Sequence, residues 1–200
     1  ADLSATENCT LSLAVVTPTE ETLVFDIKSF GIASHAETDE KDDIFAEESF
    51  GDTNVYNQDN TTEATSAIGE DGRSVSIDID NFNGSADTWR TQWFVNTGLE
   101  LEQGRIYSIS LTLTATATQS DIEFLWGDGS SKDFTDQFSQ KGIALVGGEP
   151  TTISVDAVSP LTPIADFGFK LQVGNGAGIE SQTNTITLAN LQILTSKGID

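Results

Sequence analysis

Tryptophan and side-chain amides recur on separate segments of this 200-residue sequence, in a mixture suited to binding a sugar. A flat aromatic ring can stack on the apolar C–H face of a pyranose, and amide, carboxylate or guanidinium groups can hydrogen-bond its hydroxyls. The side chains that could do this are Trp89, Arg90, Gln92, Trp126, Lys170 and Gln172. We expect sugar binding where they share one exposed surface.

The spacing of Trp89 and Gln92 leaves two arrangements open. Residues three apart on a regular strand point to opposite faces, so these two share a surface only if Trp89 precedes the strand or a bulge intervenes. Otherwise Trp89 joins Trp93 in the core. The outer face then carries Arg90, Gln92 and Phe94.

Four segments alternate polar and apolar residues with a period of two, which is typical of half-buried strands. They are Ser74–Asp80, Arg105–Ala117, Phe167–Val173 and Thr185–Ile193. In the last of them the inward set changes register, which predicts a β-bulge near Asn190. Strands at short spacing, turn residues between them and no helical period predict an all-β sandwich of antiparallel sheets.

Charge and composition argue against several kinds of partner. Nine Lys and Arg against 32 Asp and Glu give a formal net charge of −23, which repels nucleic acid, anionic membranes and polyanionic glycans. We therefore expect no nucleic-acid partner, no membrane insertion and a neutral ligand. With one Cys, one His and no arrangement for nucleophilic catalysis, we expect no enzyme. A monomer is expected as well.

An ordered set of motifs runs along most of the chain. The set comprises Asp87-x-Trp89-x-x-Gln92, Leu-x-Leu-x-x-Gly-x-x-Tyr-x-Ile-x-Leu over Leu99–Leu111, Ala115-x-Ala117, Phe167–Gly174 and the final strand Thr185–Ile193. In this order the motifs resemble the carbohydrate-binding modules of families four, nine and twenty-two, roughly from Glu48 to Thr195. The resemblance implies a galactose-binding-like β-sandwich jelly roll with two antiparallel sheets.

The same resemblance assigns roles to single residues. Trp89 and Gln92 match positions that contact a glycan in a cleft on the concave sheet, and Gln172 matches an amide on a late strand. Trp126 falls near a second ligand-binding aromatic, or packs in the core as many sandwich tryptophans do. Tyr56 lies at the position of the cleft rim, as a rim aromatic or a packing anchor.

The function implied by the resemblance is non-catalytic binding of a neutral polysaccharide, either β-glucan or xylan. Aromatic stacking and amide hydrogen bonds would hold the glycan with little rearrangement of the protein. The resemblance further implies an extracellular or cell-surface location, in a larger glycan-active or glycan-binding protein.

Calcium is the cofactor that the resemblance suggests. The family often holds a structural Ca²⁺ between main-chain oxygens near the first strands and an Asp in the last strand, but Ala189 occupies that Asp position here. The acidic run Glu37–Glu48 is interpreted as a solvated loop, with a Ca²⁺ site as the alternative, so the metal-binding residues stay unknown. A calcium-stabilised structural or adhesive sandwich is therefore the second hypothesis, and a glycoside hydrolase the third.

The chain is expected to divide near residue 40. Residues 1–40 are interpreted as an N-terminal extension with one or two strands, of which Leu23–Phe30 is the clearer. This extension would pack on the module or lead into it. Residues 41–200 would then form the sandwich, within a single compact domain overall.

Overall fold

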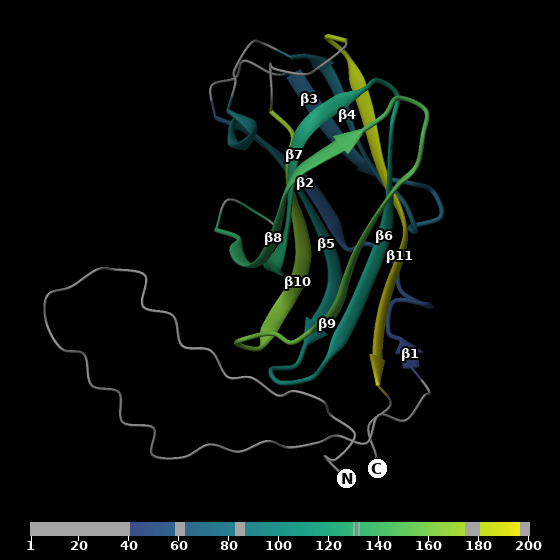
Figure 1. The fold of residues 1–200 in the computed structure, drawn as a ribbon, viewed down its shortest axis with the longest axis vertical. Helices are drawn as coiled ribbons and strands as arrows, with labels where there is room; N and C mark the ends of the chain where they lie inside the picture. The colour runs from purple at the N-terminus through teal and green to yellow at the C-terminus, as the bar shows by residue number, and fades with distance from the viewer. Residues whose placement is uncertain are drawn as a thin grey trace, which may run out of the picture. The chain divides into compact units, whose positions relative to one another are not determined.

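The computed structural model describes residues 41–58, 63–82, 87–129, 131, 133–174 and 181–196. Within these residues the chain forms a six-stranded and a five-stranded sheet, and all paired strands are antiparallel (Figure 1). The predicted all-β sandwich of two antiparallel sheets is therefore confirmed. The predicted N-terminal extension, with its strand Leu23–Phe30, lies outside the described residues.

The six-stranded sheet carries the last strand of the chain near its centre. Its strands are β1 (Lys41–Asp43), β3 (Glu63–Ile68), β4 (Val75–Asn81), β6 (Tyr107–Ala115), β9 (Thr151–Val158) and β11 (Asn184–Ser196). Their order is β3-β4-β11-β6-β9, and β1 pairs with the end of β11. Neighbouring strands are therefore mostly distant in sequence, so side chains on this sheet are brought together by long-range pairing.

The five-stranded sheet positions most of the side chains that the sequence singled out. Its strands are β2 (Asp52–Asn57), β5 (Thr91–Leu101), β7 (Gln119–Asp128), β8 (Thr135–Leu145) and β10 (Ile164–Gln172), in the order β2-β5-β10-β7-β8. A 3-10 helix, η2 (Thr88–Arg90), leads directly into β5. Among the described residues, no helix combines the length and apolar character needed to cross a membrane.

Apolar side chains from both sheets form one core between them. Tyr107, Ile109 and Leu111 of β6 are buried, while the residues between them are half-buried, as a period of two requires. On β10, Phe167 and Phe169 are fully buried and their rings meet edge to face at 5.2 Å. The predicted alternation of burial is confirmed for β6. On β10 the predicted inward residues are buried, but Gly168 and Lys170 on the other face are buried too, so this strand is not half-buried as predicted.

The predicted bulge in the last strand is present. The pairing of β11 with β6 shifts between Ala189 and Gln192, and Asn190 adopts a left-handed backbone conformation with φ of 54°. Asparagine tolerates this region better than most residues. The bulge lets Leu188 and Leu191, three positions apart, both point into the core.

The acidic run near the start of the described chain is partly a strand, so its interpretation as a loop was wrong for Lys41–Asp43. This segment forms β1 and pairs with Leu194–Ser196 of β11. Asp43 contributes its side chain too, because its Oδ1 accepts the backbone N–H of Ile193 at 3.1 Å. Pairing with a long strand outweighs the weak strand preference of Lys and Asp. Residues Glu37–Glu40 lie outside the described residues.

Candidate functional site

Trp89 lies in the short helix η2, immediately before β5, and its residue surface is 40% exposed. Because it precedes the strand, strand alternation does not force its side chain to the face opposite Gln92. Of the two arrangements that the sequence left open, the structure therefore has the first. Trp93, inside β5, is fully buried instead, and its Nε1 donates to Thr53 Oγ1 at 2.9 Å.

Backbone hydrogen bonds hold η2 between two strands of the five-stranded sheet. The carbonyl of Thr88 accepts the N–H of Gly174, and the carbonyl of Arg90 accepts the N–H of Gln58, both at 2.9 Å. A Cβ at Gly174 would lie 2.6 Å from the backbone nitrogen of Thr91, so glycine is what permits this close approach. Trp89 is thus presented by a turn that is tied to the chain beyond both β2 and β10.

A row of polar side chains crosses the outer face of the five-stranded sheet. Tyr56 of β2 pairs with Gln92 of β5, Gln92 with Gln172 of β10, and Gln172 with Glu123 of β7. Adjacent strands lie about 4.8 Å apart, so this polar row spans about 14 Å at right angles to the strands. The structure therefore brings Tyr56, Gln92 and Gln172 together, as expected for a shared surface.

Glu123 is the member of the polar row that the sequence did not identify. Its side chain is 14% exposed and forms an ion pair with Lys141 at 3.2 Å. Its neighbours Ile122 and Phe124 are buried in the core, so local alternation places Glu123 on the outer face. Its position beside Gln172 depends on the pairing of β7 with β10, for which the sequence carries no local signal.

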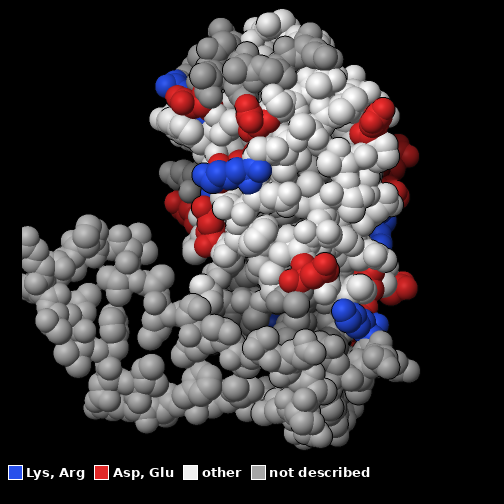
Figure 2. All heavy atoms as spheres, in the orientation of Figure 1, with Lys and Arg blue, Asp and Glu red and all other residues white. Residues whose placement is uncertain are grey.

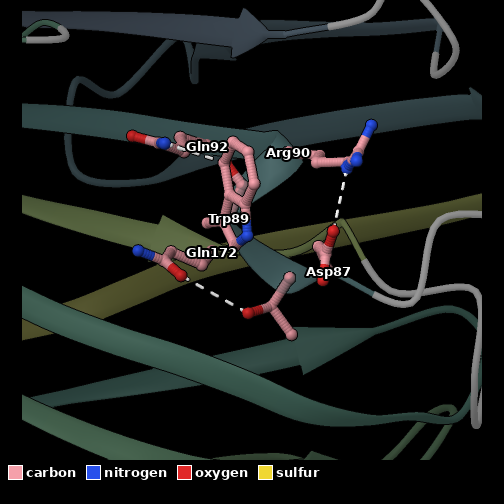
Figure 3. A network of polar contacts seen from close by, with 6 residues as sticks. Asp87, Trp89, Arg90, Gln92 and Gln172 are labelled. Carbon is pink, nitrogen blue, oxygen red and sulfur yellow. Dashed lines mark hydrogen bonds and ion pairs between the residues drawn. The ribbon is translucent and has the colours of Figure 1, made fainter.

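The two glutamine side chains are oriented by hydrogen bonds around Trp89. Gln92 Nε2 donates to the Trp89 carbonyl at 2.8 Å, and Thr88 Oγ1 donates to Gln172 Oε1 at 3.3 Å. Figure 3 shows the indole standing beside both amides. Within the described residues, Gln92 Oε1 and Gln172 Nε2 have no protein partner, which leaves a carbonyl oxygen as acceptor and an amino group as donor for a ligand.

Arg90 lies beside Trp89 but is directed away from the glutamines (Figure 3). Its Nε is 3.0 Å from Asp87 Oδ2, and its guanidinium carbon lies 5.4 Å from the centre of the indole ring. One guanidinium can cover only one face of the ring. In this arrangement Arg90 supports the orientation of Trp89 rather than extending the polar row.

Trp126 is part of the core, so the expectation that it contacts a ligand was wrong. It is 2% exposed and packs edge to face against Phe167 with ring centres 5.7 Å apart. Alternation with Ile122 and Phe124 points its indole inward, to the face opposite Gln172. That spacing was visible in the sequence, but the unbroken apolar run Phe124–Trp126 obscured it.

Part of the same outer face is covered by Phe134, which lies between β7 and β8 in the chain. Phe94 and Leu125 point outward from their strands, yet they are 1% and 3% exposed. Phe134 lies over Phe94 with ring centres 6.0 Å apart, and the Lys170 ammonium is 5.1 Å from the Phe134 ring. Lys170 also forms an ion pair with Asp136 at 2.6 Å. The cover leaves the polar row beside Trp89 as the open strip.

The described residues hold no group of three or more His, Cys, Asp or Glu that could bind a metal ion. Ala189, which the sequence resemblance placed at the position of a calcium-binding Asp, is in β11 next to the bulge. The acidic residues Glu37–Glu40 fall outside the described part of the chain. Calcium binding therefore stays a prediction.

Comparisons with known proteins identify the fold. No protein-family model matches the sequence, and neither does any curated protein. A family 4 carbohydrate-binding module superimposes with a TM-score of 0.51 at 18% identity, over 79% of this chain and 96% of that one. The second N-terminal cellulose-binding domain of Cellulomonas fimi β-1,4-glucanase C gives 0.48 at 22% identity, over 82% and 100% of the two chains. The CBM22-1 xylan-binding domain of Paenibacillus barcinonensis Xyn10C gives 0.41 at 11% identity, over 83% and 99%.

The first of these superpositions spans nearly the whole of the module. The described strands of this chain form the same two-layered, all-β architecture. The chain therefore has the β-sandwich jelly-roll fold of a carbohydrate-binding module, as the sequence resemblance implied.

Proposed function

We propose that this protein is a non-catalytic module that binds a neutral polysaccharide, β-glucan or xylan, along the polar row of the five-stranded sheet. One observation carries the proposal: an exposed indole, Trp89, is held beside the two in-register amides of Gln92 and Gln172. The ring provides a stacking surface for a pyranose, and the amides provide hydrogen-bond partners for its hydroxyls.

The cover formed by Phe134 favours one direction for the glycan. Because Phe94 is buried beneath Phe134, and Leu125 on the same face is buried as well, the exposed strip crosses the strands from Tyr56 to Glu123. A sugar chain lying along this strip meets one polar side chain on each strand it crosses. Tyr56, which is 39% exposed, would contact the chain at the outer edge.

A neutral glycan suits the charge of the protein. The net charge of −23 opposes binding of uronate-rich or sulfated polymers, whereas a neutral chain meets no such repulsion. On the face seen in Figure 2, acidic side chains are scattered over a largely uncharged described surface. Within a larger extracellular protein, such a module would raise the local concentration of substrate around a catalytic domain.

Affinity gel electrophoresis tests the proposal. We expect barley mixed-linkage β-glucan or soluble xylan in a native gel to retard the protein, and Trp89→Ala to migrate as it does without glycan. Leu161→Ala is the matched control, because Leu161 is also an exposed apolar side chain, at 78% exposure, but lies in the turn before β10. If no neutral glycan retards the unmodified protein, the proposed function is wrong.

A further inference from the structure

A hollow of about 450 Å³ opens on the outer face of the other sheet, at the bulge of β11. It is lined by Asp43, Arg73, Ser110, Leu111, Thr112, Thr152, Asn190, Leu191 and Gln192. Ser110 and Thr112 alternate with buried residues of β6, so their hydroxyls belong to the outer face. Asn190 and Gln192 are exposed on either side of the buried Leu191. This bulge hollow lies on the six-stranded sheet, whereas the polar row lies on the five-stranded one.

A gap between two strands creates the bulge hollow. β4 pairs with β11 as far as Leu188, and β1 pairs with β11 from Leu194 onward. Among the described residues, no strand pairs with 189–192 on this edge. The bulge also shifts this segment relative to β6. The hollow is thus a consequence of strand pairing and does not depend on side-chain positions alone.

The two charged groups of the bulge hollow are held in place by the protein. Asp43 Oδ1 accepts the backbone N–H groups of Phe45 and Ile193, each at 3.1 Å. Arg73 Nη1 donates to the carbonyls of Ala46 and Glu48, at 2.5 and 2.9 Å. Its guanidinium also lies over the Phe45 ring, 5.2 Å from the ring centre. A carboxylate acceptor and a guanidinium donor are therefore preorganised at this site.

The chemistry of the lining selects a ligand that both donates and accepts hydrogen bonds. The lining combines hydroxyls, two amides, one carboxylate and one guanidinium, and it includes no aromatic ring. A sugar hydroxyl is donor and acceptor at once, so a polyhydroxylated neutral molecule can match all four kinds of group. A polyanion would meet Asp43 and the acidic protein around it. The volume falls within the range of small-ligand sites, about 300–1,000 Å³.

We propose that the bulge hollow is a second saccharide site, which takes one or two sugar units of a neutral glycan through hydrogen bonds and without aromatic stacking. It binds a chain end or a side branch, because the hollow is a local gap in strand pairing rather than a strip across the sheet. This proposal does not rest on the function proposed for the polar row, since the two sites share no residue.

The test is a titration of the ¹⁵N-labelled full chain with cellobiose and, separately, with xylobiose, followed through backbone amide shifts. We expect saturable shifts at Asn190, Leu191 and Gln192 that persist in Trp89→Ala. Gln192→Ala should raise the dissociation constant read from these amides about fivefold, the effect of one lost hydrogen bond. Thr152→Ala should raise the same dissociation constant. Thr187 lies on the outer face of β11 but does not line the hollow. Thr187→Ala should therefore leave the dissociation constant unchanged.

Two results would overturn the second site. One is the absence of saturable shifts at residues 190–192 at the solubility limit of both disaccharides. The other is an unchanged dissociation constant in both Gln192→Ala and Thr152→Ala. The polar row is read separately, from the amides of Gln92 and Gln172, so failure of one site is distinguishable from failure of the other.

Discussion

The inner and outer faces of the five-stranded sheet are made by the same strands but offer opposite chemistry. The inner face carries Phe167, Phe169 and Trp126, all at most 2% exposed, whereas the outer face carries Gln92 and Gln172 beside an exposed indole. Trp89 and Trp126 thus have different environments despite their identical side chains. The element that presents a tryptophan, a turn before a strand or the strand itself, decides whether the ring can meet a ligand.

The outer face is itself divided. Its covered part, beneath Phe134, buries Phe94 and places Lys170 against Asp136. Its open part is the polar row. An outward direction on a strand is therefore necessary for ligand contact but not sufficient, because a connecting segment can fold over the sheet.

The largest effect is expected from a substitution on the inner face, and it is a loss of stability. Trp126→Ala should lower the free energy of unfolding by about 3–5 kcal/mol, because it leaves a cavity among Phe138 and Phe167. Urea denaturation measures this loss. Trp126→Phe is the control and should cost far less, because it keeps an aromatic ring and removes an indole N–H that has no partner among the described residues. A loss below about 1 kcal/mol in Trp126→Ala would contradict its core position.

Trp89→Ala should weaken glycan binding and leave stability nearly unchanged, whereas Trp126→Ala should lower stability. We expect the dissociation constant for mixed-linkage β-glucan to rise about 30-fold, or about 2 kcal/mol, as for a tryptophan at the centre of a binding surface. The free energy of unfolding should change little, because Trp89 is 40% exposed. Isothermal titration calorimetry and urea denaturation of the same preparations give the two values. Equal affinity of Trp89→Ala and the unmodified protein would remove Trp89 from the site.

Gln172→Ala should weaken glycan binding by about fivefold, the effect of one hydrogen bond. Thr88→Ala tests whether the orientation of this amide matters, because it removes the donor that bonds Gln172 Oε1 while the amide stays. We expect a smaller loss of about twofold from Thr88→Ala. Calorimetry under identical conditions ranks the two variants, and a larger effect of Thr88→Ala would show that Gln172 is not the ligand partner.

The smallest effect is expected from Lys170→Met, in the covered part of the outer face. The substitution keeps an unbranched side chain beneath Phe134 but removes the ion pair with Asp136, whose side chain is 48% exposed. We expect a stability loss of about 0.5–1 kcal/mol by urea denaturation. Glycan affinity should change less than about twofold. A change comparable to that of Gln172→Ala would mean that the ligand extends under the cover.

The sequence alone predicted much of this arrangement. A period of two placed Phe167 and Phe169 inside and Gln172 outside, and the change of register in the last strand located the bulge at Asn190. For Trp126 the same rule was available, but Leu125 interrupts the alternation with another apolar residue. The structure places Leu125 on the outer face at 3% exposure, in register with Lys170 of the neighbouring strand β10.

Other features depended on parts of the chain that are far apart in sequence. The strand β1 exists because an acidic segment pairs with the end of β11, and its own residues do not favour a strand. Glu123 joins the polar row through the same kind of pairing, between β7 and β10. Neither pairing leaves a pattern in the local sequence.

The amino-acid sequence by itself determined which side of each strand is apolar, because the direction of successive side chains along a strand is a local property of the backbone. Only the tertiary structure decided which outward side chains become neighbours and which stay open. Trp89 meets Gln172 because backbone hydrogen bonds anchor η2 to the chain beyond β10, and Phe94 is closed off because a distant segment folds over it. Both features depend on contacts between segments that are far apart in the chain, and a pattern in the local sequence does not specify such contacts.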